Sequence, residues 1–303
     1  IAERRLSQDG RYSLASPDSS VDVRVSTMPT MCGEKIVLRL MRARAVVPRL
    51  EQLGMSPGLL DRYRRLVAQA HGFIVACGPT GSGKTTTLYA SLAERNVVAQ
   101  NLCSVEDPVE IRLAGVSQVQ INVRAGVTFP AVLRSFLRQD PNVIMIGELR
   151  DSETANAGVA AALSGQMVLT TLHSRDVTRT FERFDELGVS RSSLAASLSA
   201  VLSQRLVRML CQECRTRLGD GYEPMGCESC DGTGFRGRCA IFELLIVDDC
   251  MRDAIARGEA GARIALLSGT APSEGLRAEG SRLVRAGRTS TAELHRVLGA
   301  AAK

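Results

Sequence analysis

Aromatic side chains are scarce in this 303-residue sequence, which contains no tryptophan and only 4% aromatic residues in total. Proteins that bind single-stranded nucleic acid combine a basic surface with aromatic rings on which the bases stack. The formal net charge of +6 is modest for a chain of this length. The composition therefore gives little sign of a nucleic-acid partner, and we expect none.

Long apolar runs are also missing. No stretch approaches the roughly 20 residues of a membrane-spanning helix, and the first residues do not form the apolar core of a signal peptide. Without an export signal, the nine cysteines favour a reducing compartment, in which thiols stay free or bind metal. We expect a cytoplasmic protein, and because Ile1 lies within a strand-like pattern we expect further sequence upstream.

Two patterns divide the sequence. Residues 1–41 are predicted to be β-structure, because VDVRVS and EKIVLRLM alternate apolar and polar positions and Asp9-Gly10 is a turn signal. Two prolines and a glycine end the alternation in ARAVVPRLEQLGMSP, residues 43–57. We therefore predict a first domain over residues 1–43, a linker over 44–58 and a larger domain over 59–303.

The larger domain is predicted to be an α/β fold with a parallel sheet. FIVAC (73–77), NLCSV (101–105), NVIMI (142–146) and MVLTT (167–171) are short apolar runs separated by polar segments, as in alternating strands and helices. Residues 176–209 are predicted to be helical, a cysteine-bearing loop region follows, and the tail over 248–303 is predicted to be helical again. Ser290 and Glu293 form a candidate capping box at the start of the last helix.

A phosphate-binding loop follows the first of these runs. GPTGSGKT, residues 78–85, matches G-x-x-x-x-G-K-[ST] in full, between a predicted strand and a predicted helix. Its backbone N–H groups and the helix N-terminus suit phosphate, with Lys84 on the β- and γ-phosphates and the Thr85 hydroxyl on Mg²⁺. The predicted nucleotide-binding residues here are Gly78, Pro79, Thr80, Gly81, Ser82, Gly83, Lys84, Thr85 and Thr86.

Acidic residues follow two other runs. In NVIMIGELRD the run ends in Gly147 where P-loop enzymes usually have a Mg²⁺-binding aspartate, and the carboxylate comes one residue later as Glu148. SVEDPVE adds Glu106 and Asp107, and TTLHS adds His173. If the strands are neighbours, all these side chains lie on the side of the phosphate-binding loop. Glu148 could also be a solvated acid at a strand end, and an isolated histidine is more often structural, but His173 at this place could sense the γ-phosphate.

Four cysteines form two C-x₂-C pairs. Cys211 and Cys214 in CQEC, with Cys227 and Cys230 in CESC, have the spacing of a tetrahedral Zn²⁺ site with four thiolate ligands. The alternative is four small buried residues. We predict a small zinc module over about residues 208–240.

The motifs together resemble those of the secretion ATPases, specifically the assembly ATPases of type II secretion and of type IV pili. GPTGSGKTTTLY looks like their Walker A motif, SVEDPVE like their aspartate box, IMIGELRD like their atypical Walker B motif, and GQMVLTTLHS like their histidine box. The resemblance extends over RVSTMPTMCGEKIVLRL upstream and GFRGRCAIFELL downstream. It implies a RecA-like ATPase domain preceded by the end of a PAS-like α+β domain.

The resemblance also implies roles for individual residues. Glu148 would orient the attacking water as catalytic base, while Mg²⁺ would depend on Thr85, water, Glu106 and Asp107. The assembly branch carries a tetracysteine module, as this sequence does. Arg24 and Arg39 lie in alternating patterns that place each opposite its apolar neighbours. They could be solvated arginines on a sheet face, but the family presents matching arginines to the nucleotide.

For the whole protein the resemblance implies a homohexamer that hydrolyses ATP, with Mg²⁺ and Zn²⁺ as cofactors. Its partners would be an inner-membrane platform protein and a recruiter, so that the protein lies at the periphery of the inner membrane and drives pseudopilus assembly. VDVRVST favours type II secretion, and type IV pilus assembly is the alternative.

Two positions depart from the family pattern. Gly165-Gln166 replaces the usual Gly-His at the start of the histidine box, and Arg175 replaces a later Asn. These departures keep a low-turnover, nucleotide-dependent scaffold open as an alternative. A DNA-acting RecA-like ATPase with a zinc ribbon is the other, although the low aromatic content does not favour it.

Overall fold

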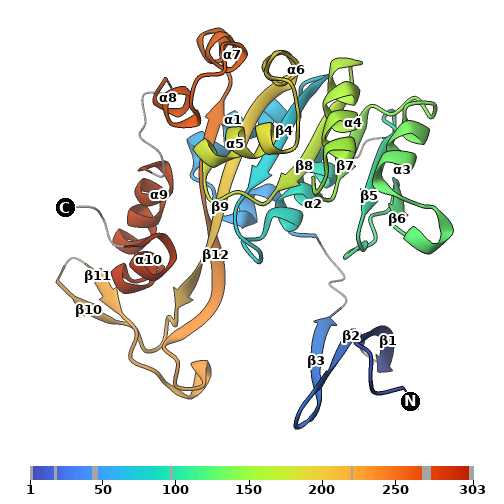
Figure 1. The fold of residues 1–303 in the computed structure, drawn as a ribbon. Coiled ribbons are helices and arrows are strands. Elements are labelled where there is room, and N and C mark those ends of the chain that lie inside the picture. The colour runs from blue at the N-terminus through green and yellow to red at the C-terminus, as the bar shows by residue number, and fades with distance from the viewer. Residues whose placement is uncertain are drawn as a thin grey trace. The chain divides into compact units, whose positions relative to one another are not determined.

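The chain divides near residue 47 into two structural units in the computed structural model (Figure 1). The structure describes residues 3–16, 19–42, 47–95, 98–219, 221–267 and 274–299. One unit comprises residues 1–47 with 110–112, and the other comprises residues 48–109 with 113–303. Within the range predicted as a linker, η1 (Leu50–Leu53) and the start of α1 at Pro57 belong to the larger unit.

The described part of the smaller unit is a three-stranded antiparallel sheet in the order β1 (Gln8–Ser16), β2 (Ser19–Thr30) and β3 (Gly33–Arg42). The predicted strands are present, but burial follows the apolar pattern only in part: Val23 is fully buried and Arg24 half-buried, whereas Leu38 and Leu40 of β3 are exposed. The predicted turn at Asp9-Gly10 is wrong. Both residues lie inside β1, where pairing with Ser26 and Val25 of β2 keeps the backbone extended.

Among the described residues, the larger unit contains a seven-stranded sheet in the order β12-β9-β4-β8-β7-β5-β6. The strands from β9 to β6 run parallel, and β12 pairs antiparallel with β9 at one edge. The predicted parallel sheet is therefore confirmed. Its strands are β4 (Gly72–Cys77), β5 (Leu102–Glu106), β6 (Val116–Gln120), β7 (Val143–Ile146), β8 (Met167–Leu172), β9 (Leu198–Leu210) and β12 (Phe235–Ile246).

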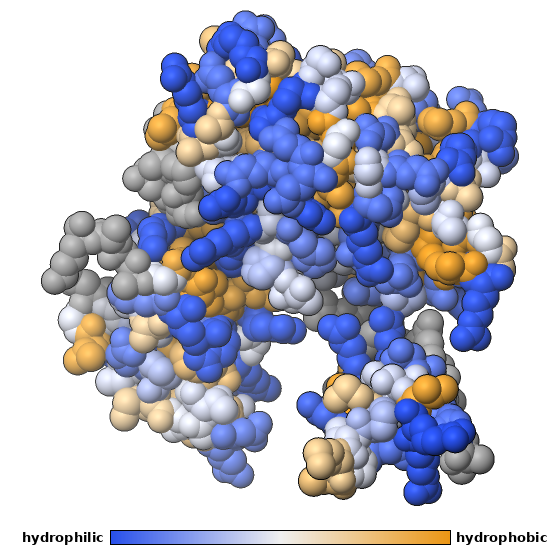
Figure 2. Space-filling view, in the orientation of Figure 1, coloured by the Kyte–Doolittle hydropathy of each residue, from blue (hydrophilic) through white to orange (hydrophobic). Residues whose placement is uncertain are grey.

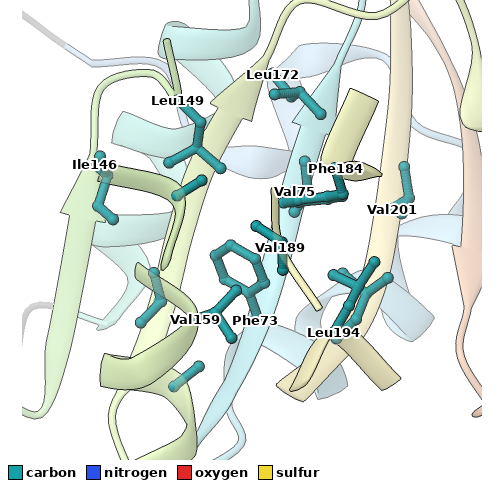
Figure 3. Packing of buried hydrophobic residues seen from close by; sticks show 14 of the residues in the cluster. Phe73, Val75, Ile146, Leu149, Val159, Leu172, Phe184, Val189, Leu194 and Val201 are labelled. Carbon is teal, nitrogen blue, oxygen red and sulfur yellow. The ribbon is translucent and has the colours of Figure 1, made fainter. Parts of the chain in front are cut away.

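Helices cover both faces of this sheet (Figure 1). Phe73 and Val75 of β4 point into the larger hydrophobic core, where they meet Val159, Phe184 and Leu194 of the helices on one face (Figure 3). The Phe73 and Phe184 rings lie 5.9 Å apart at a tilt of 57°, a favourable aromatic geometry. The α-helices are α1 (Pro57–Val67), α2 (Lys84–Arg95), α3 (Phe129–Phe136), α4 (Ser152–Leu163), α5 (Val177–Glu186), α6 (Arg191–Ser197), α7 (Asp249–Ala256), α8 (Gly261–Leu266), α9 (Glu274–Arg285) and α10 (Thr291–Leu298).

The prediction of helix over residues 176–209 is wrong from residue 198 onward. Helices α5 and α6 are present, but residues 198–210 form β9. The Leu, Ser, Ala, Gln and Arg residues of this segment do not prefer strands by themselves. Pairing with β4 on one side and β12 on the other outweighs their local preference, and it places residues 198–204 among the fully buried part of the sheet.

Beyond the sheet, β9 and β12 continue as a two-stranded ribbon that packs on α9 and α10 through a second cluster of buried apolar residues. The cysteine pairs lie at the end of this ribbon, with the hairpin of β10 (Thr216–Leu218) and β11 (Gly221–Glu223) between them. The short helix η3 (Glu228–Cys230) lies within the second pair, and Cys227 is its N-cap. A further short helix, η2 (Val123–Ala125), follows β6. The predicted capping box of the last helix is half present. The Ser290 hydroxyl accepts a hydrogen bond from the backbone N–H of Glu293, whereas the Glu293 carboxylate accepts hydrogen bonds from Arg208 and Arg296.

None of the helices in the described ranges is long and apolar enough to cross a membrane. Hydrophilic residues cover most of the visible face of the larger unit, and apolar residues lie there in separate small patches (Figure 2).

Candidate functional site

The phosphate-binding loop joins β4, in the interior of the sheet, to α2, which begins at Lys84. Gly78, Gly81 and Gly83 have φ angles of 149°, 76° and 91°, a backbone region that side-chain-bearing residues avoid. A Cβ atom on Gly78 would lie 2.5 Å from the Gln204 carbonyl oxygen. The curvature of the loop therefore requires all three glycines, and close packing on β9 is a second requirement at Gly78 and Gly83.

The Lys84 side chain folds back along the loop. Its Nζ atom donates hydrogen bonds to the carbonyl oxygens of Gly78, at 2.8 Å, and of Pro79, at 3.0 Å. Burial lowers the pKa of the Lys84 ammonium, while Cys77 and Glu148 nearby favour its charged form. A buried cation held at the start of a helix provides a site for an anionic group.

The loop fits a phosphate in a further respect. The Ser82 side chain is 3% exposed, and its Oγ atom is buried without a hydrogen-bond partner among the described residues. A buried hydroxyl of this kind costs free energy unless a ligand or water satisfies it. Together with the N-terminus of α2 and the Lys84 ammonium, Ser82 favours phosphate binding.

Next to the loop, four side chains form a connected polar network at the carboxyl ends of β5, β7 and β8. Arg150 forms ion pairs with Glu148 and, at 3.2 Å, with Asp107. The Nε2 atom of His173 lies 3.4 Å from Glu148 Oε2. The Glu148 side chain is 17% exposed, against 41% for Asp107. The structure thus brings together residues from three segments that the sequence analysis singled out, and adds Arg150.

Gly147 has a structural reason to be glycine. A Cβ atom there would lie 3.3 Å from both the Cα atom of Glu106 and the carbonyl oxygen of Val105 in neighbouring β5. The Gly147 backbone is fixed on both sides, since its N–H donates to Val105 and its carbonyl accepts from the Thr171 hydroxyl at 2.7 Å. This close approach of β5 disfavours a side chain at residue 147, and the carboxylate of the motif stands at the next residue, Glu148.

Glu106 and Asp107 lie in different environments. The Glu106 side chain is 2% exposed and accepts hydrogen bonds from Tyr89, from Ser104 at 2.5 Å and from Gln118 at 3.2 Å. Asp107 instead reaches Arg150 in the polar network. The predicted binding of Mg²⁺ by both acids stays a prediction, and Asp107 is the better placed of the two relative to Glu148.

His173 lies beside two oppositely charged groups. Burial lowers the pKa of its imidazole, and the Lys84 ammonium lowers it further, while Glu148 acts in the opposite direction. With its pKa below the ordinary value of 6.5, His173 is mainly neutral at pH 7. A neutral imidazole can accept or donate a hydrogen bond to a phosphate oxygen or to water.

The four cysteines form the predicted cluster. Their Sγ atoms all lie within 4.8 Å of one another. The distances are 3.8 Å between Cys211 and Cys227, 3.8 Å between Cys214 and Cys230, and 3.7 Å between Cys227 and Cys230. A tetrahedral Zn²⁺ with Zn–S bonds of about 2.3 Å separates its sulfurs by about 3.8 Å. The cluster therefore has the dimensions of a zinc site.

The surroundings of Cys230 also suit a metal ligand. Burial opposes ionisation of its thiol, but the backbone N–H groups of Cys227 and Gly234 donate to its sulfur, at 3.2 Å each, and lower its pKa below the ordinary value of a thiol. Gly226 donates in the same way to Cys214 at 3.3 Å. Donors of this kind stabilise thiolates, the form that binds metal.

In the smaller unit, Arg24 and Arg39 occupy directly opposed positions of β2 and β3. Directly opposed residues of an antiparallel pair share one face of the sheet, as the sequence patterns predicted. A third arginine, Arg11, which the sequence patterns did not indicate, holds the register position opposite Arg24 on β1.

Comparison with known proteins places these features in one family. The model of the family "Type II/IV secretion system protein" matches residues 1–296. The chain belongs to this family. It is 46% identical to the type II secretion system protein HxcR of Pseudomonas aeruginosa over 98% of its length, and 44% identical to the type IV pilus assembly ATPase PilB of Thermus thermophilus over 87%.

This secretion-family chain spans 63% of the Pseudomonas protein and 32% of the Thermus protein. The fold is also similar to a crystal structure of the pilus retraction motor PilT with bound ADP, with a TM-score of 0.70 at 24% identity. That similarity covers 96% of this chain and 77% of the PilT chain. It confirms the predicted ATPase fold.

The two departures from the family pattern lie at opposite ends of β8. Gln166 precedes the strand, and its backbone carbonyl accepts a hydrogen bond from Gly72 at the start of β4. The six residues of β8 separate Gln166 from the phosphate-binding loop by roughly 20 Å. Arg175, in contrast, lies two residues after His173, and its carbonyl accepts a hydrogen bond from Arg205. Of the two, only Arg175 is placed to affect the site.

Proposed function

We propose that this chain is the motor part of an ATPase that hydrolyses ATP to power pseudopilus assembly in type II protein secretion. The observation that carries the proposal is the network in which Arg150 and His173 hold Glu148 beside the phosphate-binding loop. A carboxylate fixed at this position has the chemistry of a general base next to a phosphate site.

Three side chains of the site have separate roles in the proposed hydrolysis of ATP. Lys84 exchanges its contacts with the Gly78 and Pro79 carbonyls for oxygens of the β- and γ-phosphates and offsets their charge. Glu148 orients a water molecule and accepts its proton as the water oxygen bonds to the γ-phosphorus. The bond between that phosphorus and the bridging oxygen breaks, so that ADP and inorganic phosphate leave. Neutral His173 hydrogen-bonds the γ-phosphate or the water.

The cofactors follow from the donor sets. Thr85 and Asp107 would hold Mg²⁺ through oxygen ligands and water, the environment that this ion prefers. When bound, Mg²⁺ supplies neutralising charge to the phosphates. Cys211, Cys214, Cys227 and Cys230 would hold a Zn²⁺ that stabilises the fold of the module at the end of β9.

The partners and location belong to the same proposal. We propose a homohexamer at the cytoplasmic periphery of the inner membrane that works with a platform protein and a recruiter, and that residues 1–43 end a PAS-like domain. Support comes from the family match and from the type II secretion relative. Type IV pilus assembly is the second candidate, because PilB of Thermus thermophilus is nearly as similar at 44% identity.

A multiple-turnover phosphate-release assay with MgATP tests the proposal. Catalytic turnover that single-stranded DNA does not stimulate is the expected result. Nucleotide binding without turnover would favour a scaffold. Stimulation by single-stranded DNA, with affinity that falls steeply as salt rises, would favour a DNA-acting ATPase.

A further inference from the structure

Strand β9 supplies a buried amide that braces the phosphate-binding loop. Gln204 is 2% exposed and makes two side-chain hydrogen bonds to the loop and its helix. Its Nε2 donates to the carbonyl oxygen of Ser82 at 2.9 Å, and its Oε1 accepts from the Thr87 hydroxyl at 2.8 Å. The partners are 122 and 117 residues away in the chain, so the sheet alone brings them together.

The contact with Ser82 fixes the direction of a peptide group. In a trans peptide the C=O and the following N–H point to opposite sides. Because the Ser82 carbonyl points toward Gln204, the N–H of Gly83 points away from β9. Backbone N–H groups of such loops bind phosphate oxygens when they point into the loop. The orientation of this peptide is therefore a determinant of phosphate affinity.

The contact with Thr87 extends the brace to the first turn of α2. The Thr87 hydroxyl also lies 3.4 Å from the Gly83 carbonyl, as a weaker contact. The packing between the loop and Gln204 is tight, since a Cβ atom on Gly83 would lie 2.8 Å from Gln204 Nε2. One amide thus ties the last peptide of the loop to the helix that carries Lys84.

We propose that Gln204 is a positioning residue for nucleotide binding, because its amide sets the Ser82–Gly83 peptide and the start of α2 in the phosphate-binding orientation. The proposal rests on the proposed function. The positioning role requires a side chain as long as glutamine that carries one hydrogen-bond donor and one acceptor. A methionine fills similar space with neither, and a carboxylate offers only acceptors.

Two variants and one control test this role in the purified protein. Gln204→Met removes both hydrogen bonds, and Gln204→Glu removes the donor only when its carboxyl is ionised. Tyr63→Phe is the control, because it deletes a buried hydrogen bond of 2.9 Å that Tyr63 of α1 makes with Ser91. Ser91 lies on α2, as Thr87 does, but further from the loop along the helix. The dissociation constant of MgADP is measured from pH 6 to pH 9, together with the melting temperature without nucleotide.

We expect Gln204→Met to weaken MgADP binding about tenfold or more at every pH, as for a lost buried hydrogen-bond pair. Because position 204 is buried, desolvation should raise the pKa of the introduced carboxyl into the measured pH range. Gln204→Glu should then bind nearly as well as wild type at low pH, where its protonated carboxyl offers both a donor and an acceptor, and should weaken as pH rises. Tyr63→Phe should lower the melting temperature and leave the affinity within about twofold. The pH-dependent loss is the signature that general destabilisation does not produce.

Wild-type affinity in both Gln204 variants over the whole pH range would overturn the positioning role. An affinity loss in Tyr63→Phe equal to that of Gln204→Met would overturn it too, since the effect would then follow stability alone. Absence of MgADP binding by the wild-type protein itself would instead overturn the proposed function, and this inference with it.

Discussion

The Nε2 atom of His173, which follows β8, lies 3.4 Å from the Oε2 atom of Glu148, which follows β7, and Arg150 forms an ion pair with the same carboxylate. We predict that Glu148→Gln, which keeps the shape but cannot accept a proton, retains MgATP binding and lowers kcat by about two to four orders of magnitude. Steady-state phosphate release and nucleotide titration measure the two effects.

Lys84→Ala is the matched comparison for Glu148→Gln, because it should weaken MgATP binding itself. Near-normal turnover in Glu148→Gln would move the role of base to another acid. Asp107 is then the candidate, since Glu106 is buried among Tyr89, Ser104 and Gln118.

The pH dependence of the reaction should report on His173. Burial and Lys84 lower the pKa of this imidazole below its usual 6.5, so the proton binds only as pH falls through that lowered value. We expect kcat/KM to be flat between pH 8 and 7 and to decline only below about pH 6.5. His173→Gln should alter this acid limb. An acid limb that begins above pH 7 and is unchanged in His173→Gln would contradict the assignment.

The sequence predicted the site well wherever its parts are contiguous or sit at strand ends. The phosphate-binding loop is one uninterrupted motif, and the acidic segments follow short apolar runs that form neighbouring parallel strands. Their meeting near Lys84 follows from that topology. The cluster of four cysteines could be predicted from spacing, because two C-x₂-C pairs supply the four thiolate ligands of a tetrahedral zinc site.

Strand β9 shows what the sequence did not reveal. Its residues have no strong strand preference, and only pairing with β4 and β12 makes it a strand. Because residues 198–209 were predicted as helix, the contact of Gln204 with Ser82 and Thr87 could not be foreseen. Arg150 was missed for another reason: its two carboxylate partners follow different strands, and only the folded sheet brings them together.

The cysteine cluster should contain one Zn²⁺ per chain. Structural zinc in small modules contributes on the order of 10 kcal/mol of apparent folding free energy. Cys211→Ser or Cys227→Ser should therefore cause the region after residue 205 to misfold or aggregate. Cys250→Ser is the control, because Cys250 is exposed and lies outside the cluster. Metal analysis that finds no zinc, with all four thiols freely titratable, would refute this prediction.

Glu293 should contribute to stability in a defined pH window. Its side chain is fully buried, and although burial opposes ionisation, hydrogen bonds from Arg296 and Arg208 lower its pKa from 4.5 to about 2. Because the folded-state pKa is lowered, the stabilisation is present above pH 4.5 and is lost as pH falls toward 2. We expect Glu293→Gln to lower stability at pH 7 by up to about 3 kcal/mol.

Thermal melts at pH 7 and pH 3 measure this effect, and the difference between Glu293→Gln and wild type should shrink at pH 3. Glu182→Gln is the control. Its ion pair with Arg179 is exposed, and removing it should cost about 1 kcal/mol or less. Equal melting temperatures of Glu293→Gln and wild type at pH 7 would show that the buried ion pairs add nothing.

The opposed arginines of the smaller unit should act on turnover. Like charges directly opposite each other destabilise a sheet, so Arg24 facing Arg39 favours a functional role over a structural one. Arginine suits transition-state stabilisation through its planar fork and permanent charge. We predict that Arg24→Ala and Arg39→Ala each lower kcat strongly, by up to about 10³-fold as for arginine fingers, while ADP affinity changes little.

Arg5→Ala is the matched control for these variants, because Arg5 is an exposed arginine of the same unit that pairs with Glu3. It should leave turnover unchanged. Mixing Arg24→Ala subunits with Lys84→Ala subunits then separates two geometries, since activity recovers only if the arginine of one subunit completes the site of another. Wild-type rates of ATP hydrolysis by both arginine variants in the assembled state would show that the positive pair serves another purpose.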